Sequence, residues 1–196
     1  MTKEQLFKAH LNQIWENSGA LFGKLIIAIP MGVVVVLVMW GVMKIIQTKC
    51  SPDSKVFRII TERKGWILGL GFYIAILIQM GVISRTPGSV SKMVWIPFQT
   101  PGGDYLVVLY SLANLVIFIP FGVLVPKVFR GINSAWMMAL VTLMTSVLIE
   151  IVQFMLACGY SEVEDVIMNV AGGVIGYLII KFIEKRKNEK RECVEN

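Results

Sequence analysis

Long apolar runs separated by short polar segments set the pattern of this 196-residue chain. Three runs have the length and composition of a membrane span most clearly: 26–46, 105–125 and 136–158. Two others, 66–84 and 166–183, are apolar but carry scattered glycines and amides. A helix needs roughly 20 residues to cross a bilayer, and in lipid it satisfies its own backbone hydrogen bonds. The pattern therefore predicts an all-α membrane protein, a polytopic bundle of five transmembrane helices.

The residues before the first span have a different pattern. Apolar residues recur there at helical spacing on one face: Leu6, Phe7, Leu11, Ile14 and Trp15. This spacing predicts an N-terminal amphipathic helix on the membrane surface, with a disordered tail as the alternative. The expected organisation has three parts. Residues 1–65 contain the amphipathic segment, the first span and a basic loop. Residues 66–183 form a four-helix core, and residues 184–196 form a basic tail.

Composition and charge agree with a membrane protein. Hydrophobic residues make up 56% of the chain and charged residues only 16%, whereas a typical soluble domain carries about 25% charged residues. Of the 19 Lys and Arg residues, 14 fall on one side of the predicted spans and five on the other. Because cytoplasmic loops are enriched in Lys and Arg, we expect the N-terminus outside and the C-terminus inside. The net charge of +6 then reflects topology and attraction to anionic lipid, and no nucleic-acid partner is expected.

A carboxylate interrupts the fourth apolar run, where residues 148–154 read LIEIVQF. Glu150 shares one helical face with Thr142, Ser146 and Gln153. An ionised carboxylate inside a bilayer costs about 2.5–3.5 kcal/mol on insertion scales, so such a residue is normally paired, protonated or facing water. We therefore expect this polar stripe to face the interior of the bundle and not the lipid.

Other polar residues of the chain fall at a similar depth, in the half of the bilayer that faces outward. Together with the stripe they give a candidate ligand-binding site: Arg85, Asn114, Glu150, Gln153, Glu164, Asp165 and Asn169. Glu150 and Asp165 are the candidate catalytic residues of this set. A structural interpretation also stays open, in which Glu150 is a neutral acid whose hydrogen bonds only hold helices together. The sole histidine, His10, precedes the first span, so no histidine metal site and no Ser-His-Asp triad is expected, and no cofactor is predicted.

Several segments together carry a resemblance to a known family. They read NLVIFIPFGVLVP at 114–126, IEIVQ at 149–153 and EDVIMNVAGGVIGY at 164–177, preceded by WIPFQT at 95–100. In this order and spacing, the chain resembles the VanZ-like family of bacterial membrane proteins over roughly residues 66–183. The family pattern matches these positions: Asn114, Phe118, Pro120, Phe121, Gly122, Glu150, Gln153, Asp165, Asn169 and either Gly172 or Gly173. Many members carry an arginine shortly before the last acidic residues, where this chain has Gly159 and Tyr160. The protein has either lost that group or replaced it with Arg85.

The resemblance implies a multi-pass protein of the bacterial cytoplasmic membrane. The family is named for an accessory protein of glycopeptide-antibiotic resistance that acts against teicoplanin, so it also implies a role at the cell envelope. One hypothesis is a non-enzymatic protein of the cell envelope. Its outward-facing polar pocket would bind a ligand among membrane lipid, a lipid-linked cell-wall precursor or a lipoglycopeptide antibiotic.

Two alternatives stay open. One is an intramembrane enzyme that acts on a lipid or undecaprenyl-linked substrate with Glu150 as general base. No nucleophile motif supports it, so a non-enzymatic role is expected. The other is a small proton-coupled transporter in which Glu150 titrates. Five spans without an inverted repeat would then have to form a homodimer.

Overall fold

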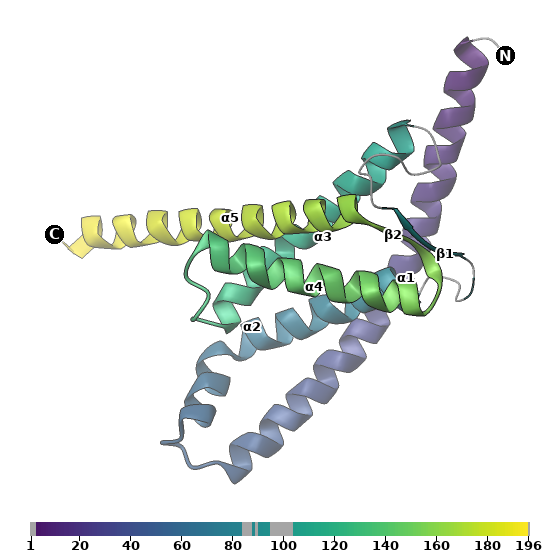
Figure 1. Ribbon diagram of the computed structural model, residues 1–196. Helices are drawn as coiled ribbons and strands as arrows, with labels where there is room; N and C mark the ends of the chain where they lie inside the picture. The colour runs from purple at the N-terminus through teal and green to yellow at the C-terminus, as the bar shows by residue number, and fades with distance from the viewer. Residues whose placement is uncertain (1–2, 84–87, 89, 95–103, 196) are drawn as a thin grey trace.

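The computed structural model of this protein is built from five long helices (Figure 1). It describes residues 3–83, 88, 90–94 and 104–195. The elements follow in this order: α1 (Lys3–Lys49), α2 (Lys55–Ile78), the π-helical turn η1 (Gln79–Ile83), β1 (Val90–Val94), α3 (Asp104–Val128), α4 (Ala135–Met155), β2 (Cys158–Glu162) and α5 (Val163–Glu195). Within these residues, five helical segments are long and apolar enough to cross a membrane. The predicted all-α membrane protein with five spans is confirmed.

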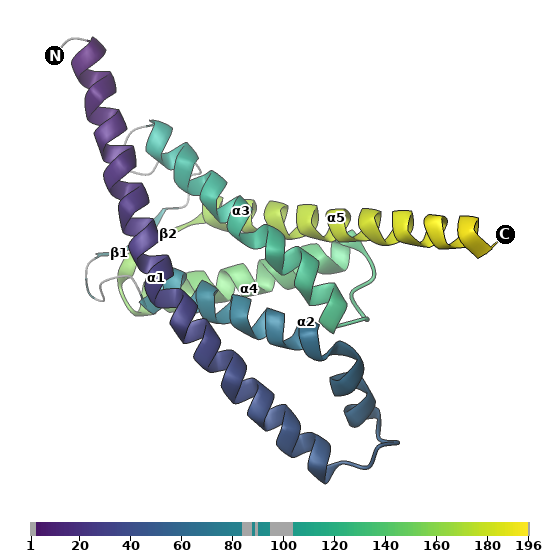
Figure 2. The same ribbon diagram turned by 180° about the vertical axis from the view of Figure 1, so that it is seen from behind.

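The N-terminal region differs from the expectation in one respect. Its amphipathic segment is helical, but it runs into the first span as part of a single helix of 47 residues. The junction between the two, residues 16–25, contains no proline, so every backbone N–H there can continue the hydrogen-bond ladder. As a result, the N-terminal end of α1 projects beyond the other helices (Figures 1 and 2).

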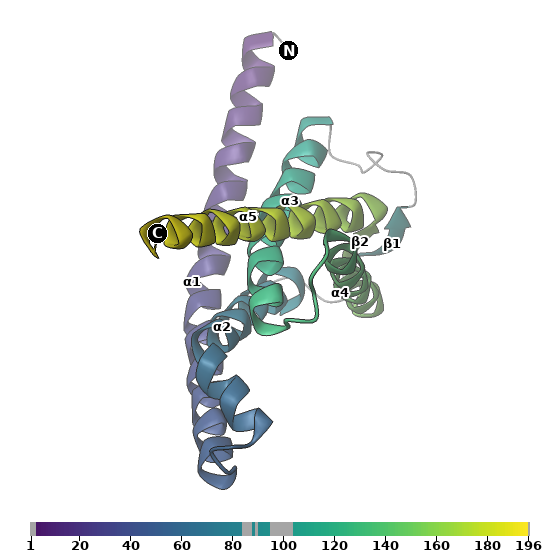
Figure 3. The same cartoon turned by 90° about the vertical axis from the view of Figure 1, so that its left-hand side faces the viewer.

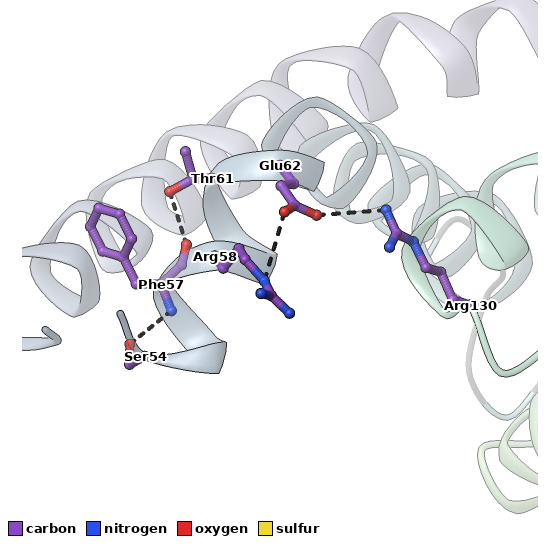
Figure 4. A network of polar contacts seen from close by, with 6 residues as sticks. All are labelled: Ser54, Phe57, Arg58, Thr61, Glu62 and Arg130. Carbon is purple, nitrogen blue, oxygen red and sulfur yellow. Dashed lines mark hydrogen bonds and ion pairs between the residues drawn. The ribbon is translucent and has the colours of Figure 1, made fainter. Parts of the chain in front are cut away.

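Serine N-caps mark where two of the helices begin. Ser54 Oγ accepts a hydrogen bond from the Phe57 N–H at 3.1 Å at the start of α2 (Figure 4). Ser134 Oγ accepts one from the Met137 N–H at 3.2 Å at the start of α4. A side-chain oxygen in this position satisfies one of the free donors of the first helical turn. Local sequence thus fixes both helix starts.

Glycines bring α3 and α5 into direct backbone contact where the two helices cross (Figure 3). A Cβ on Gly172 would lie 2.1 Å from the carbonyl oxygen of Leu115, and one on Gly176 would lie 2.1 Å from that of Ile119. Gly122 of α3 is equally close to the backbone of α5. No side chain fits at such distances, so the small-xxx-small spacing on α5 is what allows this packing.

Apolar side chains pack around the crossing of α3 and α5. The buried core consists of Leu70, Phe118, Phe121, Val125, Met138 and Tyr177. Tyr73 joins α2 to this core, because its hydroxyl donates to the carbonyl oxygen of Ile117 on α3 at 2.6 Å. Large apolar side chains such as Val34 and Leu37 on α1 are instead exposed, as expected for helix faces that meet lipid.

Two short strands pair beside the helices (Figure 1). β1 and β2 are parallel, with Val90 opposite Cys158 and Val94 opposite Glu162. The segment that precedes the fifth span forms β2, and the acidic residues Glu164 and Asp165 lie in the first turn of α5. The pairing holds the connection between α2 and α3 against the entrance to α5. It joins segments far apart in the chain, so hydropathy alone does not predict it.

Candidate functional site

The polar stripe of α4 packs against the other helices. Thr142 and Ser146 are completely buried and Gln153 is 3% exposed, whereas Glu150 is only partly buried. The difference follows from helix geometry. At 3.6 residues per turn, the first three residues lie within about 40° of one another, and Glu150 lies about 60° from their centre. Glu150 therefore lies at the edge of the buried face and not at its middle.

Asn169 of α5 supplies the polar group that meets this face. Its Nδ2 donates to Ser146 Oγ at 2.8 Å, and both side chains are buried. The helices can approach here because Gly173, one turn further along α5, has no side chain. An added Cβ would lie 2.3 Å from Thr142 Oγ1. The Oδ1 of Asn169 is buried without a hydrogen-bond partner among the described residues, which leaves one strong acceptor unused inside a membrane span.

Glu164 is buried at the start of α5, with only 3% of its side chain exposed. Its Oε1 accepts a hydrogen bond from Ser111 Oγ of α3 at 3.4 Å, and Ser111 is completely buried. This distance is long for an O–H···O bond, so the contact adds little by itself. Asp165 is the second acid of the same turn. Negative charge is favourable there, because the free N–H groups of a helix N-terminus carry partial positive charge.

Gln153 binds the π-helical turn that follows α2. Its Nε2 donates to the carbonyl oxygen of Gly81 in η1 at 2.8 Å, and its Oε1 is buried with no hydrogen-bond partner in the described part of the chain. A π-helical turn interrupts the regular backbone ladder, and such turns are frequent at functional sites. The side-chain donor from α4 compensates the altered backbone hydrogen bonding at Gly81.

The structure brings together part of the predicted ligand-binding set. Three members are buried and joined to neighbouring elements: Gln153, Glu164 and Asn169. Three are partly buried, one each on α3, α4 and α5: Asn114, Glu150 and Asp165. Arg85 and the segment 95–100 lie outside the described residues. The buried contacts form a line along α4, because Ser146 and Gln153 are two turns, or about 10 Å, apart along its axis.

Two buried oxygen atoms, Asn169 Oδ1 and Gln153 Oε1, define the chemistry of this region. A buried acceptor without a partner costs about 1–3 kcal/mol, so a bound group that donates to it would be stabilised. The arrangement suits a ligand with several donors, such as hydroxyl, amide or ammonium groups. Across the described ranges, no three His, Cys, Asp or Glu side chains come together in a way that could hold a metal ion.

Sequence reasoning missed Ser111 as a member of this region. Ser111 lies one turn before Asn114 in the same apolar run, and a polar residue within a span is the signal that marked Asn114. The part played by Gly81 left no such signal, and Gly173 was marked only as one of two possible matches to the family pattern. Gly81 contributes a backbone carbonyl, and Gly173 contributes the absence of a side chain.

Comparison with known proteins gives one family and one curated relative. The family model described as VanZ/LLP1 matches residues 70–184. Protein VanZ of Enterococcus faecium is 38% identical over 78 residues, which cover 40% of this chain and 48% of that protein. The alignment thus spans about half the length of the curated relative. No solved structure matches the chain.

Proposed function

Since the chain belongs to the VanZ/LLP1 family, we propose that it acts in the bacterial cytoplasmic membrane and lowers susceptibility to glycopeptide and lipoglycopeptide antibiotics such as teicoplanin. The family match covers residues 70–184, which include every polar contact of the candidate site. The relative from Enterococcus faecium carries the name Protein VanZ. A resistance role against teicoplanin is what the resemblance to that family implies.

The polar groups between α4, α5 and η1 are the proposed binding site, and a lipid-linked cell-wall precursor or a lipopeptide antibiotic is the proposed ligand. The observation that carries this assignment is the buried Oδ1 of Asn169, which has no hydrogen-bond partner in the part of the chain that the structure describes. Interhelical hydrogen bonds in membranes average about 0.6 kcal/mol, whereas an orphaned acceptor costs about 1–3 kcal/mol. Helix adhesion alone therefore explains the arrangement poorly. Sugars, peptides and amines of such ligands offer many donors, and a site in the outward half of the bilayer would meet them.

The test is a susceptibility measurement in a strain that lacks the gene and carries plasmid-borne variants. The wild-type protein should raise the minimal inhibitory concentration of teicoplanin, and Asn169→Ala and Gln153→Ala should return it toward the value of the deletion strain. Thr145→Ala is the matched control. Its hydroxyl lies next to the buried stripe but donates to the carbonyl of Val141 in the same helix, at 2.8 Å.

Immunoblots of membrane fractions must give equal amounts of all variants, so that lost protection is not lost protein. Glu150→Gln and Asp165→Asn are expected to lose protection as well, while the protein still inserts. The proposal fails if deletion and overexpression of the gene both leave teicoplanin susceptibility unchanged.

A second candidate is an intramembrane enzyme that acts on a lipid or undecaprenyl-linked substrate. The partial exposure of Glu150 beside the buried stripe favours it, because a general base must be able to reach its substrate. Mass spectrometry of the membrane lipids separates the two candidates. An enzyme should change at least one lipid species between wild type and deletion strain, and Glu150→Gln should reproduce the deletion profile. Identical lipid profiles in the presence of antibiotic protection would leave binding as the function.

A further inference from the structure

A polar cavity lies at the opposite end of the helices from the line of contacts on α4. It has a volume of about 290 Å³ and is formed by the start of α2, the end of α3, the turn that follows it and the middle of α5. Six charged side chains line it: Glu62, Arg63, Lys127, Arg130, Lys181 and Glu184. Four of these are cations and two are anions, so the cavity carries a net positive charge.

The two acids are already engaged by cations of the cavity. Glu184 pairs with Lys127 and, at 3.4 Å, with Lys181. Glu62 lies 3.6 Å from Arg130 (Figure 4). Two carboxylates cannot neutralise four cations, so positive charge remains after these pairs are formed.

Arg63 has one hydrogen-bond donor that is satisfied and one that has no partner among the described residues. Its Nη1 donates to the carbonyl oxygen of Val128, the last residue of α3, at 2.6 Å. A cation at a helix C-terminus is favourable, which explains this one bond. The Nε of the same side chain is buried with no hydrogen-bond partner within the described residues. A buried donor attached to a permanent cation is best satisfied by an anionic oxygen.

Trp66 indicates that the cavity lies at the level of the lipid headgroups. Its side chain is 41% exposed, and Lys127 Nζ lies 5.3 Å from the centre of its ring. Tryptophan is enriched at the interface between water and hydrocarbon, and Lys stems extend toward the same level. The uneven distribution of Lys and Arg predicts that this end of the helices faces the cytoplasm, where anionic lipids attract basic segments.

We propose that this cavity binds the anionic phosphate headgroup of a membrane lipid such as phosphatidylglycerol. Basic pockets between transmembrane helices on the cytoplasmic side bind headgroups of this chemistry. The volume of about 290 Å³ lies just below the range for pockets of drug-sized ligands, about 300–1,000 Å³, so it fits a headgroup while the acyl chains lie along the exposed apolar faces of the helices. The phosphate would accept from Arg63 Nε, and Lys181 and Arg130 would add charge at the rim.

Native mass spectrometry of the full-length protein in mild detergent tests the proposal. The protein is mixed with equal amounts of dioleoylphosphatidylglycerol and dioleoylphosphatidylcholine, and the bound lipids are counted. We expect phosphatidylglycerol adducts to dominate. Arg130→Gln should lower the preference about fivefold, the factor expected for one charge near an anionic headgroup. The Arg130 side chain is 72% exposed, so this substitution should leave folding intact. Arg63→Gln should lower the preference further.

Lys190→Gln is the matched control, because it removes a cation of α5 beyond the cavity. Equal retention of the two lipids, or equal losses in Lys190→Gln and Arg130→Gln, would overturn the proposal. Glycerol 3-phosphate distinguishes a lipid from a soluble phosphate. If it displaces phosphatidylglycerol at equal concentration, the cavity binds soluble phosphates and the lipid assignment is wrong. None of these outcomes bears on teicoplanin susceptibility, so the two proposals can fail independently.

Discussion

Gly176→Ala should separate the two helices that form the centre of this protein. Gly176 lies where α5 crosses α3, and its added Cβ would lie 2.1 Å from the carbonyl oxygen of Ile119 and 3.0 Å from the Cα of Gly122. Both contacts are with backbone, so no change of side-chain rotamer relieves them. Non-bonded heavy atoms pack at about 3.5 Å, and α5 would therefore have to move away from α3 by about 1 Å or more.

The size of the effect follows from two opposing terms. Overpacking of a close-packed core costs about 1–3 kcal/mol, and the lost contacts here would include the buried aromatic residues around the crossing. Replacement of a helical glycine by alanine otherwise stabilises a helix by about 0.5–1 kcal/mol, because glycine loses more backbone entropy on folding. The difference between the two terms leaves a net loss, so we expect the free energy of unfolding to fall by about 0.5–2 kcal/mol in Gly176→Ala.

Unfolding in mixed micelles with rising SDS, followed by circular dichroism, measures this free energy. Gly41→Ala is the control, because Gly41 lies inside α1 and its added Cβ would meet nothing within 4 Å. The control should be as stable as wild type or slightly more stable. The reasoning is refuted if the two variants have the same free energy of unfolding, since the helix contact would then not be as close as the structure describes.

Three further predictions concern neighbouring contacts. Gly173→Ala should destabilise the protein, because its Cβ would lie 2.3 Å from Thr142 Oγ1. Thr142→Ala in the same chain should restore part of the lost stability, and additive effects in the double-mutant cycle would contradict this. Tyr73→Phe should cost about 0.5–1.5 kcal/mol in the same unfolding assay, because it removes a hydrogen bond of 2.6 Å to α3; an unchanged midpoint would speak against that bond. Arg63→Met should cost about 1.5–3 kcal/mol through the lost charged bond to the end of α3, and trypsin should then cleave more readily after Arg130, in the turn beyond α3.

The polar stripe of α4 illustrates what sequence can and cannot predict about the site. A polar residue in an apolar span is visible in the sequence, because the cost of burying it in lipid is a property of that residue alone. The partner that it finds is not visible. Asn169 bonds to Ser146, and Gln153 to a backbone carbonyl in η1. These pairings depend on the rotation and crossing of helices, which distant residues determine.

Glu150 shows that a charge in the sequence does not predict how deeply its side chain is buried. It is the most conspicuous residue of its span, yet the residues that lie fully buried on that face are Thr142 and Ser146. The charge of Glu150 is visible in the sequence. Its partial burial instead depends on its position on the helix, about 60° from the centre of the buried face. Glu164 was predicted for its charge, but its contact with Ser111 could be found only once α3 and α5 were placed side by side.

Hydropathy by itself determined the number of spans and their order, because the transfer of each segment into lipid is a local free energy. The family resemblance rested on residue motifs within those spans. Serine caps set the starts of α2 and α4 for the same local reason. Tertiary structure alone decided the long-range relations: the pairing of β1 with β2, the backbone contact between α3 and α5, and the basic cavity around Arg63. Each of these joins residues from distant segments, and the free energy that selects them comes from packing complementarity, which no single segment contains.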